Sequence, residues 1–129
     1  MFDPKKEVPS LELCKRLKEL GYPQDGGGWY WDLRAEGFEK VRFFERTPKK
    51  EIIKAGFYLK APTVVEMGEW LPENWNIVSI RYGNGHYGIS SHELKSELMW
   101  EADTEANARA KLLIWLVENG HMGFEKEEK

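Results

Sequence analysis

The sequence contains one cysteine, Cys14, and no apolar stretch long enough to cross a bilayer. A single cysteine excludes an internal disulfide, and the longest apolar run, residues 112–117, is far shorter than the roughly 20 residues of a membrane-spanning helix. The first six residues lack the apolar core of a signal peptide. We therefore expect a soluble protein of the reducing cytoplasm, with no membrane contact, in which Cys14 is a small core residue.

Histidine is also scarce, and the three histidines, His86, His92 and His121, are scattered along the chain. The first follows a hairpin turn, the second lies in a polar linker and the third comes just after a helix end. Because no two of them share a helical i, i+4 face, their spacing does not favour a metal site. We expect neither a metal nor a cofactor.

Motifs that carry a reaction are lacking as well. The glycine-rich residues 25–28 do not have the Lys-Ser/Thr ending of a phosphate-binding loop, so they are typical of a turn. Residues 90–93 place serine beside histidine and glutamate, but adjacent residues cannot normally converge on one reacting atom. Glu66, Glu69 and Glu73 lie on the outer face of a short helix, where solvated acids are expected. We predict no catalytic residue and no enzyme; only a deep pocket would revive that alternative.

The chain is rich in aromatic residues and carries its basic charge locally. Aromatic residues make up 13% of the 129 residues, and six of them are tryptophan, which is a high number for this length. The net charge is −3, but residues 34–60 carry eight basic and four acidic side chains, whereas residues 61–129 carry six and twelve. The basic charge is therefore concentrated in one short part of the chain.

A strand-to-helix junction near the middle of the chain organises the predicted fold. Pro62 forbids a helix through it and holds the preceding residue in an extended conformation. Thr63 followed by Glu66 has the spacing of a capping box, so a strand ends and a helix begins at this point. The helix, residues 63–71, is too short to be stable alone and must pack on a sheet formed by the strands around it.

Alternating hydrophobicity, helical periodicity and turn signals define the other elements. The first three strands are separated by short turns, which favours an antiparallel meander. Because the helices do not alternate regularly with strands, we predict one α+β domain over residues 1–129, with an antiparallel sheet of five or six strands, helices packed on it and a long C-terminal helix. Residues 1–8 and 124–129 are expected to be flexible. The expected helices span residues 10–20, 63–71 and 104–119, and the expected strands span residues 29–34, 40–46, 52–60, 75–82, 87–91 and 97–102.

The long C-terminal helix has apolar residues on two sides. The stripe expected to face the sheet contains Ala106, Ala110, Leu113 and Val117. Trp115 falls on the opposite side of the helix, beside Leu112. Either the first helix covers Trp115, or Trp115 and Leu112 form a contact with a partner protein, and we favour the first alternative.

Three segments of the sequence carry a resemblance to other proteins. Residues 13–22 read LCKRLKELGY, residues 61–63 read APT before a helix that ends in Trp70-Leu71, and residues 102–104 read ADT before the run ARAKLLIWL. In this order and spacing, the chain resembles a group of small proteins of unknown function encoded by bacteriophages and prophages, over most of its length. The resemblance implies a phage or prophage origin and the cytoplasm of a bacterial host. It transfers no catalytic residue.

The first three strands have two chemically different faces. The apolar face, which we expect to lie on the core, contains Trp29, Trp31, Leu33, Val41, Phe43, Phe57 and Leu59. The other face displays Tyr30, Arg34, Arg42, Phe44, Arg46, Tyr58 and Lys60. Rings that stack on bases, next to cations that neutralise phosphates, are typical of a platform for single-stranded nucleic acid. Exposed sheet faces also favour these residue types for their strand propensity and solubility alone. Replacing Tyr30 and Phe44 by alanine is expected to abolish single-strand binding and to leave the fold intact.

A protein-interaction module is the function that we favour. The chain has more large apolar side chains than a small core accommodates easily, and Trp115 with Leu112 is the expected interface. The partner is an unknown protein or a second copy of the chain. We therefore predict a non-catalytic accessory protein of phage type, with single-stranded nucleic-acid binding as the alternative.

Overall fold

The computed structural model of this chain describes residues 4–34, 40–54, 56–71, 77–81, 85–91 and 100–124. The first part of the chain contains α1 (Pro4–Glu7), α2 (Leu11–Glu19), β1 (Gly28–Asp32), β2 (Lys40–Phe44), α3 (Lys50–Lys54) and β3 (Tyr58–Lys60). The second part contains α4 (Val64–Gly68), β4 (Ile77–Arg81), β5 (Tyr87–Ser91), β6 (Trp100–Ala102) and α5 (Glu105–Glu118). The α+β class predicted from the sequence is confirmed.

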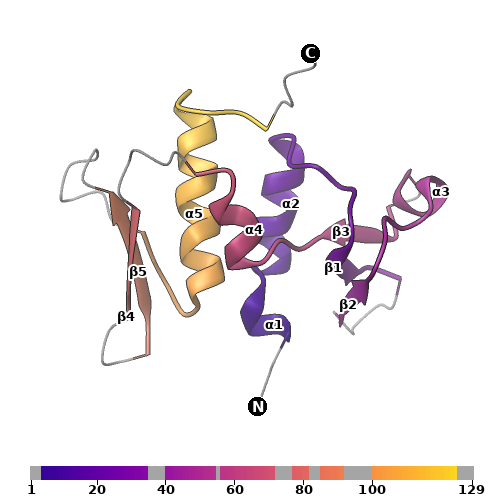
Figure 1. Ribbon diagram of the computed structural model, residues 1–129, viewed down its shortest axis with the longest axis horizontal. Coiled ribbons are helices and arrows are strands. Elements are labelled where there is room, and N and C mark those ends of the chain that lie inside the picture. Colours follow the sequence, from indigo (N-terminus) through magenta and orange to yellow (C-terminus); the bar gives the residue numbers. More distant parts are fainter. Residues whose placement is uncertain are drawn as a thin grey trace.

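The strands of the described ranges form two separate antiparallel sheets of three strands each. One sheet has the order β2-β1-β3 and the other has the order β4-β5-β6. The prediction of one sheet with five or six strands is therefore wrong. Helices lie between the two sheets, because β5 and β6 pack on one side of α5, whereas β3 packs on α2 (Figure 1).

The strand order of the first sheet also differs from the predicted meander, because a helix lies where a strand was expected to begin. Residues 52–60 were predicted to form one strand, but Ile52 and Ile53 belong to α3. Gly56 ends this helix with a positive φ of 77°. Its N–H donates to the Ile53 carbonyl at 3.0 Å, and the Phe57 N–H donates to the Ile52 carbonyl at 3.4 Å, which is a Schellman C-cap. With α3 inserted, the connection is long enough for β3 to pair with β1 on the side away from β2.

The strand-to-helix junction at Pro62 is confirmed. The Glu66 N–H donates to Thr63 Oγ1 at 3.3 Å, and the Thr63 N–H donates to Glu66 Oε1 at 3.1 Å, so both hydrogen bonds of the capping box are present. The helix that follows is α4, which ends earlier than the predicted residue 71. Its Met67 is fully buried against the cluster around α5, and this contact anchors the short helix.

The C-terminal helix α5 is the central element of the molecule. It begins after Thr104, whose hydroxyl accepts the Asn107 N–H at 3.1 Å, as the sequence predicted. β5 and β6 pack on one side of α5, and α2 and α4 pack on the other (Figure 1). Apolar residues on both sides of the helix are therefore buried, among them Ala106, Ala108, Ala110, Leu112, Leu113 and Leu116.

A second, smaller core lies between α2 and the β2-β1-β3 sheet. It contains Cys14 and Trp31 together with Val8, Leu59 and Ala61. The Trp31 Nε1–H donates to the Pro9 carbonyl at 3.1 Å, which fastens the chain before α2 to the sheet. Burial raises the pKa of the Cys14 thiol to about 12, so Cys14 is an inert core residue, as predicted.

The ends of the chain are partly built into these cores. The predicted flexible lead-in, residues 1–8, contains the helical turn α1, and Val8 is buried. At the other end, the Phe124 ring is buried and contacts Tyr22 and Trp70, with ring centroids 5.0 and 5.2 Å away. Residues 1–3 and 125–129 lie outside the described ranges. No helix within the described ranges is long and apolar enough to cross a membrane.

Candidate functional site

The β2-β1-β3 sheet carries the residues that we predicted to bind nucleic acid. The register places Tyr30 directly opposite Arg42 on β2 and opposite Lys60 on β3. Directly opposed residues of antiparallel strands project from the same side, so these three side chains share one face, as the sequence pattern predicted. We call it the even face, and its strand side chains are Tyr30, Asp32, Lys40, Arg42, Phe44, Tyr58 and Lys60. Arg34 and Arg46 lie just beyond the ends of β1 and β2.

The even face is not the open surface that we expected, because Tyr30 at its centre is 0% exposed. The loop before β1 folds over it: the Tyr30 hydroxyl donates to the Gly26 carbonyl at 2.6 Å, and Gln24 Oε1 accepts the Lys60 N–H at 2.9 Å. Burial raises the pKa of Tyr30 to about 12. The expected exposure is therefore wrong for Tyr30, and also for Tyr58 and Lys60, which are 5% and 4% exposed. Nucleic-acid bases cannot stack on the rings of Tyr30 and Tyr58 in this conformation.

Lys60 is a buried cation held by three groups. Its Nζ donates to the Gly27 carbonyl at 2.7 Å and lies 3.4 Å from Glu66 Oε2 and 4.9 Å from the centroid of the Tyr30 ring. Glu66 was expected to be a solvated acid, but it is half-buried and serves both Lys60 and the capping box of α4. Lys60 on β3 thereby connects the glycine-rich loop to α4. Its charge is already paired within the fold, so Lys60 has a structural role and is not free to bind a phosphate.

Two arginines of the predicted site share one buried carboxylate. Asp32 is 8% exposed; it accepts a hydrogen bond from Arg34 Nη2 at 3.0 Å, and its Oδ2 lies 3.7 Å from Arg42 Nη1. The hydrogen bonds from Arg34 hold the pKa of the Asp32 carboxyl below its usual value. Much of the positive charge of this face is therefore compensated by Asp32 and Glu66, neither of which we had included in the site.

Asp32 should make the stability of the protein depend on pH. A carboxyl whose pKa is lower in the folded state stabilises the fold above its unfolded pKa of about 3.9, and this stabilisation is lost as the pH falls through the folded pKa. We therefore expect Asp32→Asn to be less stable than the parent at neutral pH, with a difference that shrinks below about pH 4. Urea unfolding followed by tryptophan fluorescence across this range measures it, and Asp25→Asn, at an exposed acid, is the control. A difference that stays constant with pH would contradict this role of Asp32.

The part of the even face that stays accessible is small. Arg42 and Arg46 are exposed and Phe44 is half-buried, with the Arg42 guanidinium 5.7 Å from the centroid of the Phe44 ring. Phe44 and Arg46 line a shallow depression with Ile52 of α3 and Tyr58. Arg34 is exposed at the other end of the sheet and is paired with Asp32. Among the predicted nucleic-acid residues, Arg34, Arg42, Phe44 and Arg46 therefore remain within reach of a ligand.

The predicted protein interface on the C-terminal helix is largely covered. Leu112 is completely buried in the core around α5. Trp115 is half-buried between Trp100 of β6, at a centroid distance of 5.3 Å, and the His121 ring, which stacks on it at 5.2 Å. The rings that contact Trp115 belong to β6 and to the segment after α5, whereas the expected cover was the first helix. Neither residue presents the open apolar surface that an interface requires.

Exposed apolar side chains lie instead on the β2-β1-β3 sheet, on the face opposite the even face, which carries the odd-numbered residues of its strands. Phe43 of β2 is 57% exposed, and its ring packs edge-on against Trp29 of β1 at a centroid distance of 5.2 Å. Val41, two residues before Phe43 on β2, is half-buried on the same face. We call Trp29, Val41 and Phe43 the β2 patch. It continues the smaller core outward to the edge of the sheet.

We expected all residues of this face to lie on the core, and for some of them that prediction is wrong. Trp31 and Leu59 are buried beneath α2, whereas Leu33, Phe43 and Phe57 are exposed. The helices on this side of the sheet are short: α2, with nine residues, packs on β3, and α1, with four, packs on β2. They leave Leu33, Phe43 and Phe57 uncovered. The signal in the sequence was an apolar face larger than the one short helix available to cover it.

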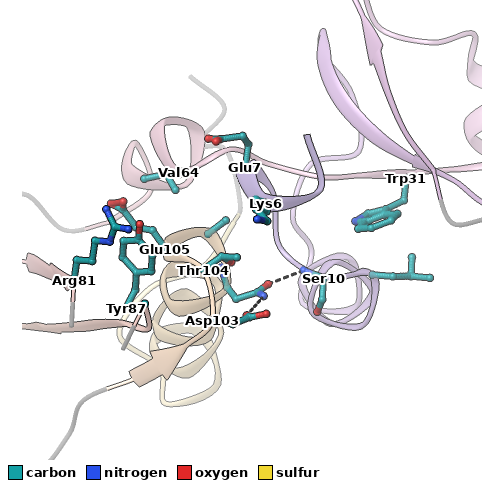
Figure 2. Close-up of a pocket in the computed structure, with 14 residues that line it drawn as sticks. Lys6, Glu7, Ser10, Trp31, Val64, Arg81, Tyr87, Asp103, Thr104 and Glu105 are labelled. Atoms are coloured by element: carbon teal, nitrogen blue, oxygen red, sulfur yellow. Dashed lines mark hydrogen bonds between the residues drawn. The ribbon is translucent and has the colours of Figure 1, made fainter. Parts of the chain in front are cut away.

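A further cleft among the described residues lies where the N-termini of α2 and α5 meet (Figure 2). It has a volume of about 800 Å³, and Trp31, Val64 and Tyr87 form part of its wall. Its two aliphatic hydroxyls already serve as helix caps, because Ser10 Oγ accepts the Leu13 N–H and Thr104 Oγ1 accepts the Asn107 N–H. The charged side chains that line it are of both signs, namely Lys6, Arg81, Glu7, Asp103 and Glu105. This mixture selects neither an anion nor a cation.

Metal-ligating residues do not gather in the described ranges. Within them, no three His, Cys, Asp or Glu side chains are close enough together to hold a metal ion. His86 lies just before β5, and His121 stacks on Trp115. Glu73, His92 and Glu93 lie outside the described residues. Of the motif at residues 90–93, only the backbone of Ser90 and Ser91 in β5 is described.

In comparisons with known proteins, no family model, curated protein or solved structure matches this chain.

Proposed function

We propose that this chain is a protein-interaction module that docks its partner through the β2 patch. The observation that carries the proposal is Phe43, a large aromatic side chain 57% exposed on a strand at the edge of a sheet. Aromatic residues that are exposed in the free protein and supported by a neighbouring ring are typical anchors of protein interfaces. The predicted interface at Trp115 and Leu112 is replaced by this patch, because those residues are covered.

The resemblance described above supports a cellular setting for this module. Similarity to small phage and prophage proteins in the first helix, the Pro62 junction and the last helix favours a phage or prophage accessory protein in the host cytoplasm. A non-catalytic role agrees with the cleft between α2 and α5, where the hydroxyls of Ser10 and Thr104 serve as helix caps and the charges are mixed.

A peptide selection tests the docking function. Random twelve-residue peptides are displayed and selected on the parent protein in the presence of excess Phe43→Ser protein, which removes peptides that bind elsewhere. We expect peptides of micromolar affinity whose affinity falls at least about 30-fold with Phe43→Ser, as for an interface anchor. Calorimetry measures the affinities.

The control for this experiment is Val65→Ser. Val65 is 74% exposed on α4, away from the β2 patch, so its replacement also removes an exposed apolar side chain and should leave the affinity unchanged. If the selection yields no peptide whose binding depends on Phe43, the proposed function is wrong.

Single-stranded nucleic-acid binding remains the second candidate, and the accessible Arg42, Phe44 and Arg46 favour it. Such binding should weaken with salt, because each phosphate contact releases counterions. Fluorescence anisotropy of labelled single strands at low and moderate salt tests this candidate. Salt-sensitive binding that Arg46→Glu removes and Phe43→Ser leaves unchanged would favour it over peptide docking.

A further inference from the structure

We propose that β2 accepts, along its open edge, an extended segment of a partner protein in which acidic and apolar side chains alternate. This inference rests on the proposed function, because the same β2 patch is the docking surface. It adds the conformation and the charge pattern of the partner.

The hydrogen-bond pattern of the sheet shows which backbone groups of β2 point outward. The Leu33 N–H donates to the Phe57 carbonyl at 2.8 Å, and the Ala61 N–H donates to the Trp29 carbonyl at 2.9 Å, so the odd-numbered residues of β1 bond to β3. In an antiparallel sheet the direction of the backbone groups alternates along each strand, so the even-numbered residues of β1 bond to β2.

The same alternation applies on β2. Arg42 is directly opposite Tyr30, so its backbone groups point towards β1, and those of Val41 and Phe43 point away from the sheet. β2 is the terminal strand in the order β2-β1-β3, and no described strand pairs with its outer edge. An added strand can therefore bond to the backbone of Val41 and Phe43, which is recognition by strand addition.

The side chains of β2 set the chemistry of that added strand. Val41 and Phe43 lie on the apolar face, so partner residues opposite them would place apolar side chains beside the β2 patch. Lys40 and Arg42 lie on the other face, both exposed, so partner residues opposite them would be acidic. Because the side chains of a strand alternate between the two faces, the partner needs alternating apolar and acidic residues.

The charges of β2 disfavour a second copy of the chain as the occupant. Two copies of β2 paired antiparallel through Val41 and Phe43 would place Arg42 directly opposite Arg42. With Val41 opposite Val41, Lys40 would face Arg42, and with Phe43 opposite Phe43, Lys40 would face Arg46. Like charges directly opposite each other destabilise a strand pair, so each register is penalised.

Three synthetic peptides test the inference. All three have nine residues and blocked ends. Glutamate alternates with valine in the first, and lysine replaces glutamate in the second. The third has the composition of the first, but its glutamates and valines form two separate blocks. We expect the first peptide to bind at least about fivefold more tightly than either of the others, because the opposed charges and the alternation both contribute. Calorimetry with the full-length chain measures the three affinities.

A matched pair of charge reversals locates the contact. Lys40→Glu should weaken binding of the glutamate peptide about fivefold and strengthen binding of the lysine peptide. Lys54→Glu, at an exposed lysine on α3, should change the affinity for either peptide by no more than about twofold. Phe43→Ser should also weaken the binding of the glutamate peptide.

The possible results separate the inference from the function on which it rests. If the selection above yields Phe43-dependent peptides, but the glutamate peptide has no advantage and Lys40→Glu has no effect, the strand inference is wrong and the docking function stands. If light scattering shows a dimer that Phe43→Ser abolishes, the occupant is a second copy and the acidic partner is wrong. If no peptide depends on Phe43, both proposals fail.

Discussion

Tyr30→Ala should lower the free energy of unfolding by about 4 kcal/mol, which is the usual cost of replacing a fully buried large aromatic side chain by alanine. The side chain is completely buried, its hydroxyl donates to the Gly26 carbonyl, and the edge-to-face contact with Phe44 would be lost. Since small domains are stable by only about 5–15 kcal/mol, much of the stability would disappear. Urea unfolding followed by circular dichroism measures the change.

The matched control is Phe43→Ala on the neighbouring strand. Phe43 is also aromatic and lies in the same sheet, but it is mostly exposed, so we expect its replacement to cost less than about 1 kcal/mol. Equal losses for the two variants would contradict the burial of Tyr30. The expectation that replacing Tyr30 and Phe44 by alanine leaves the fold intact assumed an exposed Tyr30, and the burial of Tyr30 leads to the opposite prediction.

Lys60→Met should lower the free energy of unfolding by about 2–3 kcal/mol. Methionine keeps most of the buried volume, but it leaves the Gly27 carbonyl without its donor and Glu66 without its cation. Removing one partner of a buried ion pair is costly because the other charge stays desolvated. The value is below the range for fully buried pairs, because Glu66 is partly exposed.

Two further variants show whether the unpaired carboxylate is the cause. Lys60→Met combined with Glu66→Gln should be more stable than Lys60→Met alone, because glutamine removes the charge and can still complete the capping box. Lys40→Met, at an exposed lysine of the same sheet, should change the stability by less than about 0.5 kcal/mol. A Lys60→Met protein as stable as the parent would refute the structural role of Lys60.

Local signals in the sequence predicted those parts of the fold that local chemistry determines. Thr63 and Glu66 make a capping box whose geometry depends on four consecutive residues, and Thr104 caps α5 in the same local way. The strand at Tyr87–Ser91 also has its predicted bounds. The helix α3 was missed because Ile52 and Ile53 favour strands, while the decisive residue, Gly56, acts through a positive φ and C-cap hydrogen bonds.

Long-range features of the fold could not be predicted in this way. Strand order depends on which connection is long enough to cross β1, and the division into two sheets depends on the helices that separate them. Neither property appears in the alternation of a single strand, because alternation gives the two faces of a strand but not its neighbours.

The same distinction explains the candidate site. The period of two placed Tyr30, Arg42 and Lys60 on one face correctly. It could not show that Gln24 and Gly26 would fold over that face, or that Asp32 and Glu66 would compensate its charge. The exposure of a face depends on which segments cover it. The accessible ring of Phe43 therefore lies on the face opposite the one that the sequence predicted to be exposed.

Amide hydrogen exchange of β2, resolved by residue with NMR, tests docking at the strand edge most directly. In the free protein, the amides of Val41 and Phe43 should exchange fast and that of Arg42 slowly, because of these three only Arg42 points its N–H towards β1. Adding the glutamate-valine peptide should slow exchange at Val41 and Phe43 and leave Arg42 almost unchanged. Slow exchange of Val41 and Phe43 in the free protein, or peptide-induced protection confined to other elements, would contradict the account.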